Sequence, residues 1–234
     1  SRIRRSHTAR LQVLDTLQPI ADNPNPPVFK KHTSIFVQTE DQFSKAMAEL
    51  EKAKELIIDL ETSGLDHRQD GAWIIGFALA AGRNSLKGYF VPVYAIKDTP
   101  DGPVWDRQNL FLTGKRKTRL NKLLSSKALK IFHNSAFDLK WLLQLGWKIK
   151  GPFYDTLVTS AIVDDMDNGL KSRAWEYTDN GGYDDELKAK IGKTKDFTAI
   201  SPPILAQYAA YDATATSHLY AGMLAQQQKN TAKN

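Results

Sequence analysis

In the mostly apolar segment ELIIDLET, at positions 55–62, the acid Asp59 follows three apolar residues and a second acid, Glu61, comes two places later. Asp59 and Glu61 are two residues apart, so on a β-strand their side chains point to one face, while Ile58 and Leu60 point to the other. Neighbouring carboxylates repel each other and are costly to bury unless a cation lies between them. Taken alone, the pair is best explained as a hydrated strand end. A bound cation becomes the better explanation only if further acids join the pair.

Two other segments supply such acids. In HNSAFDLKWLL, Asn134 and Asp138 are four residues apart at an expected strand-to-helix junction, and they share one face if the helix begins early. In QYAAYDATA, Tyr208 and Asp212 have the same spacing on a helix rich in alanine, which lets another element approach closely. Each of these residues, taken singly, is more simply a solvated helix residue or part of an amphipathic core.

The combination favours a shared site with four carboxylates, from Asp59, Glu61, Asp138 and Asp212. Carboxylate oxygens are the hard ligands that Mg²⁺ or Mn²⁺ requires. The chain offers no competing chemistry: its lack of cysteine excludes disulfides, thiol catalysis and zinc–thiolate sites. Gly-x-x-x-x-Gly-Lys, Gly-x-Ser-x-Gly and His-Glu-x-x-His motifs are also absent from the sequence.

The elements that must position these acids indicate an α/β domain. Apolar, β-prone runs predict five strands, at 34–39, 55–62, 72–82, 88–96 and 128–134. Helical spacing predicts helices at 40–53 (with Thr39 as N-cap), 118–126, 135–146, 155–165 and 201–228. Three consecutive strands joined by short turns indicate an antiparallel meander, and the later crossover adds a parallel strand. We therefore expect a mixed five-stranded central sheet flanked by helices.

Composition and charge divide the 234 residues unevenly. Residues 1–33 hold six basic and two acidic side chains, and four prolines fall within 19–27, so we predict a basic, proline-rich extension or linker before a domain at 34–234. The remainder is close to neutral, which makes the net charge of +6 a weak argument for a polyanionic partner. The basic run at 115–122 is explained somewhat better as a solvated helix face than as a phosphate-contacting surface.

The three acidic motifs, in this order, resemble those of the 3′–5′ proofreading exonuclease domain of family A (polymerase I-like) DNA polymerases, within the DEDD superfamily. DLETSGLD is similar to the first motif, HNSAFDLKWL to the second and YAAYDATAT to the third, and GLKSRAWEYT is similar to a segment between the last two. The resemblance runs from about Ser34 to Leu224 and implies a ribonuclease H-like fold. Tyr208 lies four residues before Asp212, and Gln207 stands where the histidine branch has His. The tyrosine (DEDDy) branch is therefore indicated.

The resemblance also implies roles for the acids in phosphodiester hydrolysis supported by two divalent cations, Mg²⁺ or Mn²⁺. Asp59 is expected to bridge both cations, Glu61 and Asp212 to complete the first metal site, and Asp138 to help hold the second. Tyr208 is expected to orient the attacking water through its hydroxyl, because a phenol with a pKa near ~10 is a poor base at neutral pH.

Other positions are expected to contact the substrate. The Thr62 backbone is placed to meet the terminal 3′ hydroxyl, and Asn134 to bind the substrate backbone or brace the site. For Leu65, two interpretations are nearly balanced: it wedges against the last base, or it only packs in the turn. Phe137 is expected mainly as a core anchor that can also touch nucleotides, and Tyr183 and Phe197 are candidate base platforms.

The implied partners are a single-stranded DNA 3′ end and a DNA polymerase domain, covalently attached or associated. Because the chain stops at Asn234, it is expected to be either a domain cut from a polymerase or a free-standing exonuclease. No run approaches the ~20 apolar residues of a membrane span and the start lacks a secretory signal, so a cytoplasmic protein is expected. Two alternatives remain open: an RNase D-like 3′–5′ exoribonuclease, and a catalytically silent module with this fold.

Overall fold

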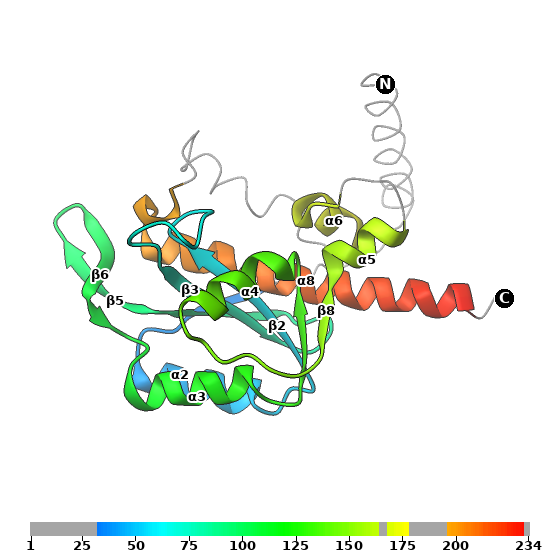
Figure 1. Cartoon of the computed structure of the whole chain (residues 1–234), viewed down its shortest axis with the longest axis horizontal. Helices are drawn as coiled ribbons and strands as arrows, with labels where there is room; N and C mark the ends of the chain where they lie inside the picture. The colour runs from blue at the N-terminus through cyan, green and yellow to red at the C-terminus, as the bar shows by residue number, and fades with distance from the viewer. Residues whose placement is uncertain (1–31, 164–167, 178–195, 232–234) are drawn as a thin grey trace, which may run out of the picture. The chain divides into compact units, whose positions relative to one another are not determined.

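The computed structural model describes residues 32–163, 168–177 and 196–231 (Figure 1). The predicted N-terminal extension therefore lies outside the described residues up to position 31, as does Tyr183. Among the described helices, none combines the length and apolar character that crossing a bilayer requires.

A mixed six-stranded sheet forms the centre of the fold, in the order β1-β4-β3-β2-β7-β8. Its strands are β1 (Thr33–Phe36), β2 (Glu55–Thr62), β3 (Ile74–Ala81), β4 (Lys87–Pro92), β7 (Leu129–Phe132) and β8 (Phe153–Asp155). The expected meander is confirmed, since β3 runs antiparallel to both β2 and β4, and β7 joins β2 in parallel. The sheet has one strand more than expected because β8 has only three residues, too few for a periodic pattern.

A separate two-stranded sheet, β5 (Tyr94–Thr99) with β6 (Gly102–Leu110), projects from the main sheet at the left of Figure 1. The run predicted as one strand at 88–96 is thus divided: β4 ends at Pro92 and β5 begins at Tyr94. Gly102 has φ +111° at the tip, a left-handed conformation that glycine adopts without strain. The sequence Pro100-Asp101-Gly102 is a turn signal that identifies this hairpin in retrospect.

Helices cover both faces of the sheet: α2 (Glu40–Leu50), α3 (Gly114–Leu124), α4 (Ser135–Gln144), α5 (Thr156–Val163), α6 (Leu170–Tyr177) and α8 (Pro202–Thr231), with the 3₁₀ turn η1 (Phe197–Ala199). Thr39 caps α2 as predicted, accepting from the Gln42 N–H at 3.2 Å. The basic run on α3 is partly neutralised by α2, because Arg119 makes a two-pronged pair with Glu51 at 2.8 Å.

Strand β2 alternates between two cores. Leu56, Ile58 and Leu60 face a core shared with α2, α3 and α4, whereas Ile57 faces a second core built largely by α8. Asp59 and Glu61 follow the register of Ile57 and therefore face the α8 side. In Figure 1, α2 and α3 lie on the side of the sheet away from α8.

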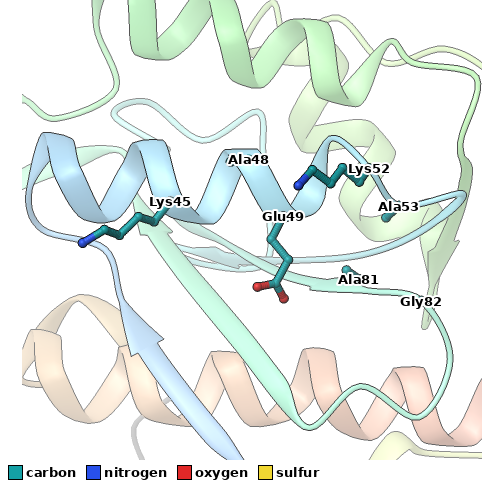
Figure 2. A pocket seen from close by; sticks show the side chains of 7 residues that line it. All are labelled: Lys45, Ala48, Glu49, Lys52, Ala53, Ala81 and Gly82. Atoms are coloured by element: carbon teal, nitrogen blue, oxygen red, sulfur yellow. The ribbon is translucent and has the colours of Figure 1, made fainter.

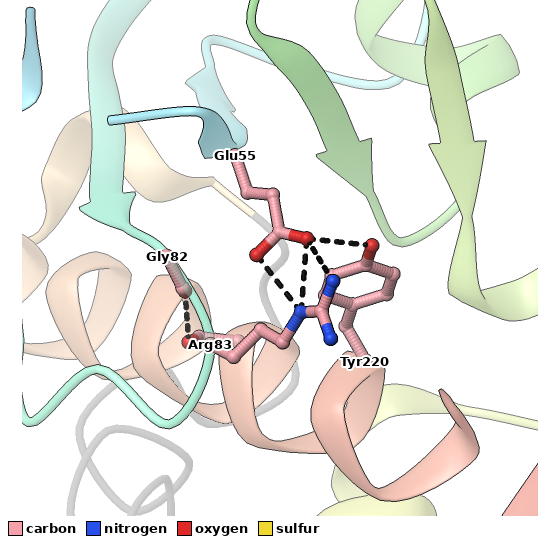
Figure 3. A network of polar contacts seen from close by, with 5 residues as sticks. Glu55, Gly82, Arg83 and Tyr220 are labelled. Carbon is pink, nitrogen blue, oxygen red and sulfur yellow. Dashed lines mark hydrogen bonds and ion pairs between the residues drawn. The ribbon is translucent and has the colours of Figure 1, made fainter. Parts of the chain in front are cut away.

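The C-terminal half of α8 is tied to the start of β2 by a polar network (Figure 3). Arg83 Nε donates to both Glu55 carboxylate oxygens at 2.9 and 3.0 Å, and the Tyr220 hydroxyl donates to Glu55 at 3.1 Å. The Arg83 guanidinium also lies 5.5 Å from the centre of the Tyr220 ring. These contacts fix the position of α8 along β2, the strand that carries two of the predicted site acids.

Candidate active site

Strand β2 presents the half-buried Asp59 and the buried Glu61 on the face of the sheet that α8 covers. Their cross-strand neighbours on β3 are the small residues Ala78 and Gly76, and the Phe90 ring packs over Gly76, where an added Cβ would lie 2.3 Å from it. Immediately after Glu61 the register shifts by a bulge, so that Thr62 pairs with Ile74. A bulge bends its strand and redirects the adjoining side chains. The chain thus leaves the sheet directly beside the acid pair.

Asp138 joins the site by replacing a missing strand partner. β7 pairs with β2 only as far as Ile57, and its chain then turns into α4, so beyond that point β2 has no strand neighbour on the edge away from β3. The Leu60 N–H donates to Asp138 Oδ1 at 3.0 Å, and Asp138 is 2% exposed. The second acidic motif is thereby fixed against the strand that carries the first.

Helix α8 contributes Tyr208 and Asp212 from adjacent turns. The helix packs closely because Ala206, Ala209 and Ala213 line its buried face. The approach is closest at Gly88 of β4, where an added Cβ would lie 2.1 Å from the Ala210 carbonyl oxygen. Small residues on both sides therefore bring the third motif onto the sheet, as the alanine-rich sequence predicted.

Three carboxylates form one cluster. Oxygen atoms of Asp59, Glu61 and Asp212 all lie within 4.8 Å of one another. Asp138 approaches β2 from α4, on the edge of the strand away from β3. Its charge interacts with that of Asp59. A set of buried and half-buried carboxylate oxygens at this spacing fits a hard divalent cation such as Mg²⁺ or Mn²⁺.

The electrostatics of the cluster oppose its own ionisation. Desolvation, reinforced by the charge of Asp212, raises the pKa of Asp59 to about 7. Desolvation and the charge of Asp59 likewise raise the pKa values of Glu61 and Asp138 well above the ordinary range. The protein thus holds together groups that repel when charged, an arrangement that a bound cation relieves.

Tyr208 stands beside the cluster as a protonated phenol. Desolvation raises its pKa above the ordinary value, and the charges of Asp212 and Glu61 add to the shift. Its hydroxyl donates a hydrogen bond to the Asp212 carboxylate. Tyr208 is therefore a hydrogen-bond donor at neutral pH and not a base.

A cavity of about 190 Å³ opens over the acids. It is lined by Asp59, Leu60, Glu61, Thr62, Gly64, Leu65, Phe137, Phe197, Tyr208 and Asp212. Three of the four predicted substrate contacts, Thr62, Leu65 and Phe137, therefore share one cavity with the acids. Leu65 is 72% exposed, and Phe197 lies 6.3 Å from the Tyr208 ring, centre to centre.

Asn134, the fourth predicted substrate contact, does not line this cavity. Helix α4 begins at Ser135, and Asn134 precedes it in the left-handed conformation with φ 74°, so Asn134 and Asp138 do not share a helical face. The Asn134 side chain is exposed, while its backbone N–H donates to Asp155 at 3.1 Å. Its geometry suits it to turning the chain between β7 and α4.

Two residues at the site did not emerge from the sequence as site residues. Lys171 of α6 contacts Asp212 directly, and nothing in the segment GLKSRAWEYT singles out this lysine as a site residue. Asp155 was expected near the start of α5, but its carboxylate also accepts from the Ser135 N–H and hydroxyl at 2.7 Å, at the start of α4. The double role depends on β8 lying next to β7, which the sequence did not predict.

We expect Asp155→Ala to destabilise the protein by about 2–4 kcal/mol, because one carboxylate caps two helices. Beyond the α4 contacts, it accepts from the Leu157 N–H at 2.9 Å on α5. Burial alone would raise the pKa of Asp155, but the bonds from Ser135 and Asn134 hold it below the ordinary value. Urea unfolding at pH 7 measures the loss. Asp98→Ala, on the exposed hairpin, serves as the control and should change stability by less than about 0.5 kcal/mol.

A wider cavity of about 580 Å³ lies at the end of α2, remote from the predicted residues (Figure 2). Its walls are alanine methyl groups and the stems of Lys45 and Lys52. Its acid, Glu49, already accepts from Lys87 Nζ and the Tyr89 hydroxyl, each at 2.7 Å. Because Glu49 is its one lining acid and is already engaged, and its other charged lining residues are the two lysines, this cavity lacks the clustered carboxylates of the site on β2.

Comparison with known proteins gives a consistent picture. A family described as 3′–5′ exonuclease matches residues 34–227. DNA polymerase I of Borreliella burgdorferi is 27% identical over 187 residues, which cover 79% of this chain and 19% of that protein. The DNA polymerase of Escherichia phage T5 is 36% identical over 130 residues, or 47% of this chain and 15% of that one. The chain thus spans less than a fifth of the length of either relative.

Among solved structures, Escherichia coli RNase D, an exoribonuclease, superimposes with a TM-score of 0.59. The match covers 84% of this chain and 46% of RNase D at 16% sequence identity. At that identity the likeness concerns the fold, and it agrees with the predicted mixed α/β architecture.

Proposed function

Because the chain belongs to the 3′–5′ exonuclease domain family of polymerase I-like DNA polymerases, we propose that it removes nucleotides from single-stranded DNA 3′ ends. The observation that carries this proposal is the convergence of three carboxylates and a tyrosine in a cavity that also exposes Leu65 and Phe137. Acids for cations, a hydroxyl for water and apolar groups for a base are the parts that terminal phosphodiester hydrolysis needs. The products would be nucleoside 5′-monophosphates.

The proposed cofactors are two divalent cations, Mg²⁺ or Mn²⁺. Asp59 would be shared between them, Glu61 and Asp212 would complete one site, and Asp138 would help hold the other. When bound, such cations stabilise negative charge on the attacking and leaving oxygens. The clustered oxygens of Asp59, Glu61 and Asp212 support the first site, and the proximity of Asp138 to Asp59 supports the second.

The remaining roles fall to groups around the cavity. The Tyr208 hydroxyl would orient the attacking water, and Gln207, exposed at the preceding position, supports the tyrosine branch over the histidine branch. The Thr62 backbone would meet the terminal 3′ hydroxyl. Leu65 and Phe137 would contact the last base, with Phe197 as a further platform. Asn134, exposed outside the cavity, would brace the turn and not the nucleotide.

We expect Tyr208→Phe to slow cleavage roughly 10- to 100-fold, the equivalent of one hydrogen bond to a charged or developing-charge group. Burial of the ring is retained, so folding and metal affinity should change little. Single-turnover cleavage and calorimetric Mn²⁺ titration measure the two properties separately. Loss of Mn²⁺ binding in this variant would contradict a role in orienting water.

The preferred nucleic acid is tested with 5′-labelled DNA and RNA oligonucleotides of the same sequence. We expect DNA to be shortened faster in Mg²⁺, and circular single-stranded DNA, which has no 3′ end, to resist. Faster shortening of RNA would favour the exoribonuclease alternative, which the shared fold of RNase D keeps open. Cutting of circular DNA would reveal endonucleolytic cleavage and contradict a strictly exonucleolytic activity.

We also propose that residues 34–234 form the exonuclease domain and that 1–33 are an extension. A polymerase domain is its proposed attached or associated partner, which the two polymerase relatives support.

A further inference from the structure

A lysine from α6 reaches into the carboxylate cluster. Lys171 Nζ contacts Asp212 Oδ1, one of the acids proposed to bind a cation, and lies 4.4 Å from the centre of the Tyr208 ring. The side chains of Lys171 and Asp212 are 27% and 9% exposed, so the contact is mostly withdrawn from water. An ammonium in such a place interacts strongly with the charges around it.

The position of Lys171 is not explained by the stability of its own helix. It occupies the second residue of α6 (Leu170–Tyr177), at the helix end whose dipole favours negative charge. Its charge instead favours ionisation of the carboxylates, because Lys171 opposes the rise in the pKa values of Asp59 and Glu61. The benefit of this lysine therefore lies in the cluster on β2 and α8.

A divalent cation and the Lys171 ammonium would compete for the Asp212 carboxylate. A cation held by Asp59, Glu61 and Asp212 would require a carboxylate oxygen of Asp212 and would repel a positive charge placed beside it. Lysine suits an exchangeable role, since its charge sits at the end of a flexible four-carbon stem.

We propose that Lys171 is an exchangeable internal counter-cation of this site: it pairs with Asp212 when no divalent cation is bound and is displaced from Asp212 when one binds. The inference rests on the proposed function, because it assumes that the cluster binds divalent cations. It adds a residue that sets the affinity of the site: Lys171 weakens cation binding by competition and limits repulsion among the acids until a cation arrives.

Calorimetric titration of Mn²⁺, without nucleic acid, tests the proposal on wild type, Lys171→Met and Lys52→Met. We expect Lys171→Met to bind Mn²⁺ roughly three- to tenfold more tightly, since no ion pair has to be broken. Lys52→Met removes the same charge at an exposed position just after α2, remote from the acids, and should match wild type. In EDTA, Lys171→Met should melt at a lower temperature than wild type, and saturating Mn²⁺ should remove most of that difference.

The outcomes separate this inference from the proposed function. Normal Mn²⁺ binding by wild type with equal or weaker binding by Lys171→Met would overturn the role of Lys171 alone. Absence of Mn²⁺ binding by wild type would overturn both. If Lys171→Met does not fold, ¹⁵N spectra of the lysine ammonium groups of wild type decide instead. Mg²⁺ should then shift or broaden the Lys171 signal, identified by its absence in Lys171→Arg, and an unchanged signal would refute displacement.

Discussion

Replacing Asp59 or Asp212 with asparagine is expected to lower the cleavage rate at least roughly 1,000-fold while leaving the protein folded. Each change removes a carboxylate from the cluster proposed to hold the cations. Charge stabilisation by bound cations is worth several kcal/mol, and each 1.36 kcal/mol corresponds to a factor of ten in rate. Single-turnover digestion of 5′-labelled single-stranded DNA in saturating Mg²⁺ measures the loss.

Stability distinguishes this loss from misfolding. Desolvation raises the pKa of Asp59 to about 7, so above pH 7 the folded protein carries a carboxylate whose ionisation the fold disfavours. The cost is absent below the pKa of the group in the unfolded chain, ~4, grows as the pH rises from there, and is fully present above the raised pKa of about 7. Asp59→Asn removes it, so this variant should be at least as stable as wild type at pH 8 in EDTA. Asp101→Asn, at the hairpin tip, is the matched control and should retain full activity. Activity of Asp59→Asn within tenfold of wild type would contradict the assignment.

Gly88→Ala is expected to have the largest effect on stability, about 3 kcal/mol or more. The new methyl group would lie 2.1 Å from the carbonyl oxygen of Ala210, an atom of the α8 backbone that cannot rotate away as a side chain would. For a chain of this size, the loss corresponds to a fall of roughly 6–12 °C in the melting temperature. Gly64→Ala provides the stability control, since an added Cβ there meets only the tip of Gln69 at 4.0 Å.

The same substitution should also impair catalysis in the molecules that remain folded. Ala210 lies between Tyr208 and Asp212 on α8, so relief of the clash moves both relative to Asp59 and Glu61 on β2. A displacement near 1 Å at a catalytic centre can lower the rate roughly 100-fold. Activity measured well below the melting temperature tests this. If Gly88→Ala melts and cleaves DNA like wild type, the position of α8 does not depend on its close approach to Gly88.

The sequence predicted those parts of the site that follow from local periodicity. Alternation along ELIIDLET placed Asp59 and Glu61 on one face, and the four-residue spacing of Tyr208 and Asp212 placed both on one helix. The alanine-rich pattern around them anticipated a close helix–sheet contact, which Gly88 completes. The motif order, and not the spacing of any one motif, indicated that these segments belong together.

The features that escaped prediction depend on contacts between distant segments. Strand β8 has three residues, and its existence is decided by its pairing with β7. That pairing brings Asp155 to the start of α4, a position that no sequence spacing encodes. Lys171 resembles any other helix lysine until α6 packs against α8 and places its ammonium on Asp212.

The direct test of the carboxylate cluster as a metal-dependent exonuclease centre is a digestion started by divalent cation. Wild-type protein is mixed with 5′-labelled single-stranded DNA in EDTA, and excess Mg²⁺ is then added while samples are resolved at single-nucleotide resolution. The account predicts intact DNA in EDTA and, after Mg²⁺, a ladder of products that shorten progressively from the 3′ end. Shortening in EDTA, immediate loss of the 5′ label as a mononucleotide, or intact DNA in both Mg²⁺ and Mn²⁺ would contradict it.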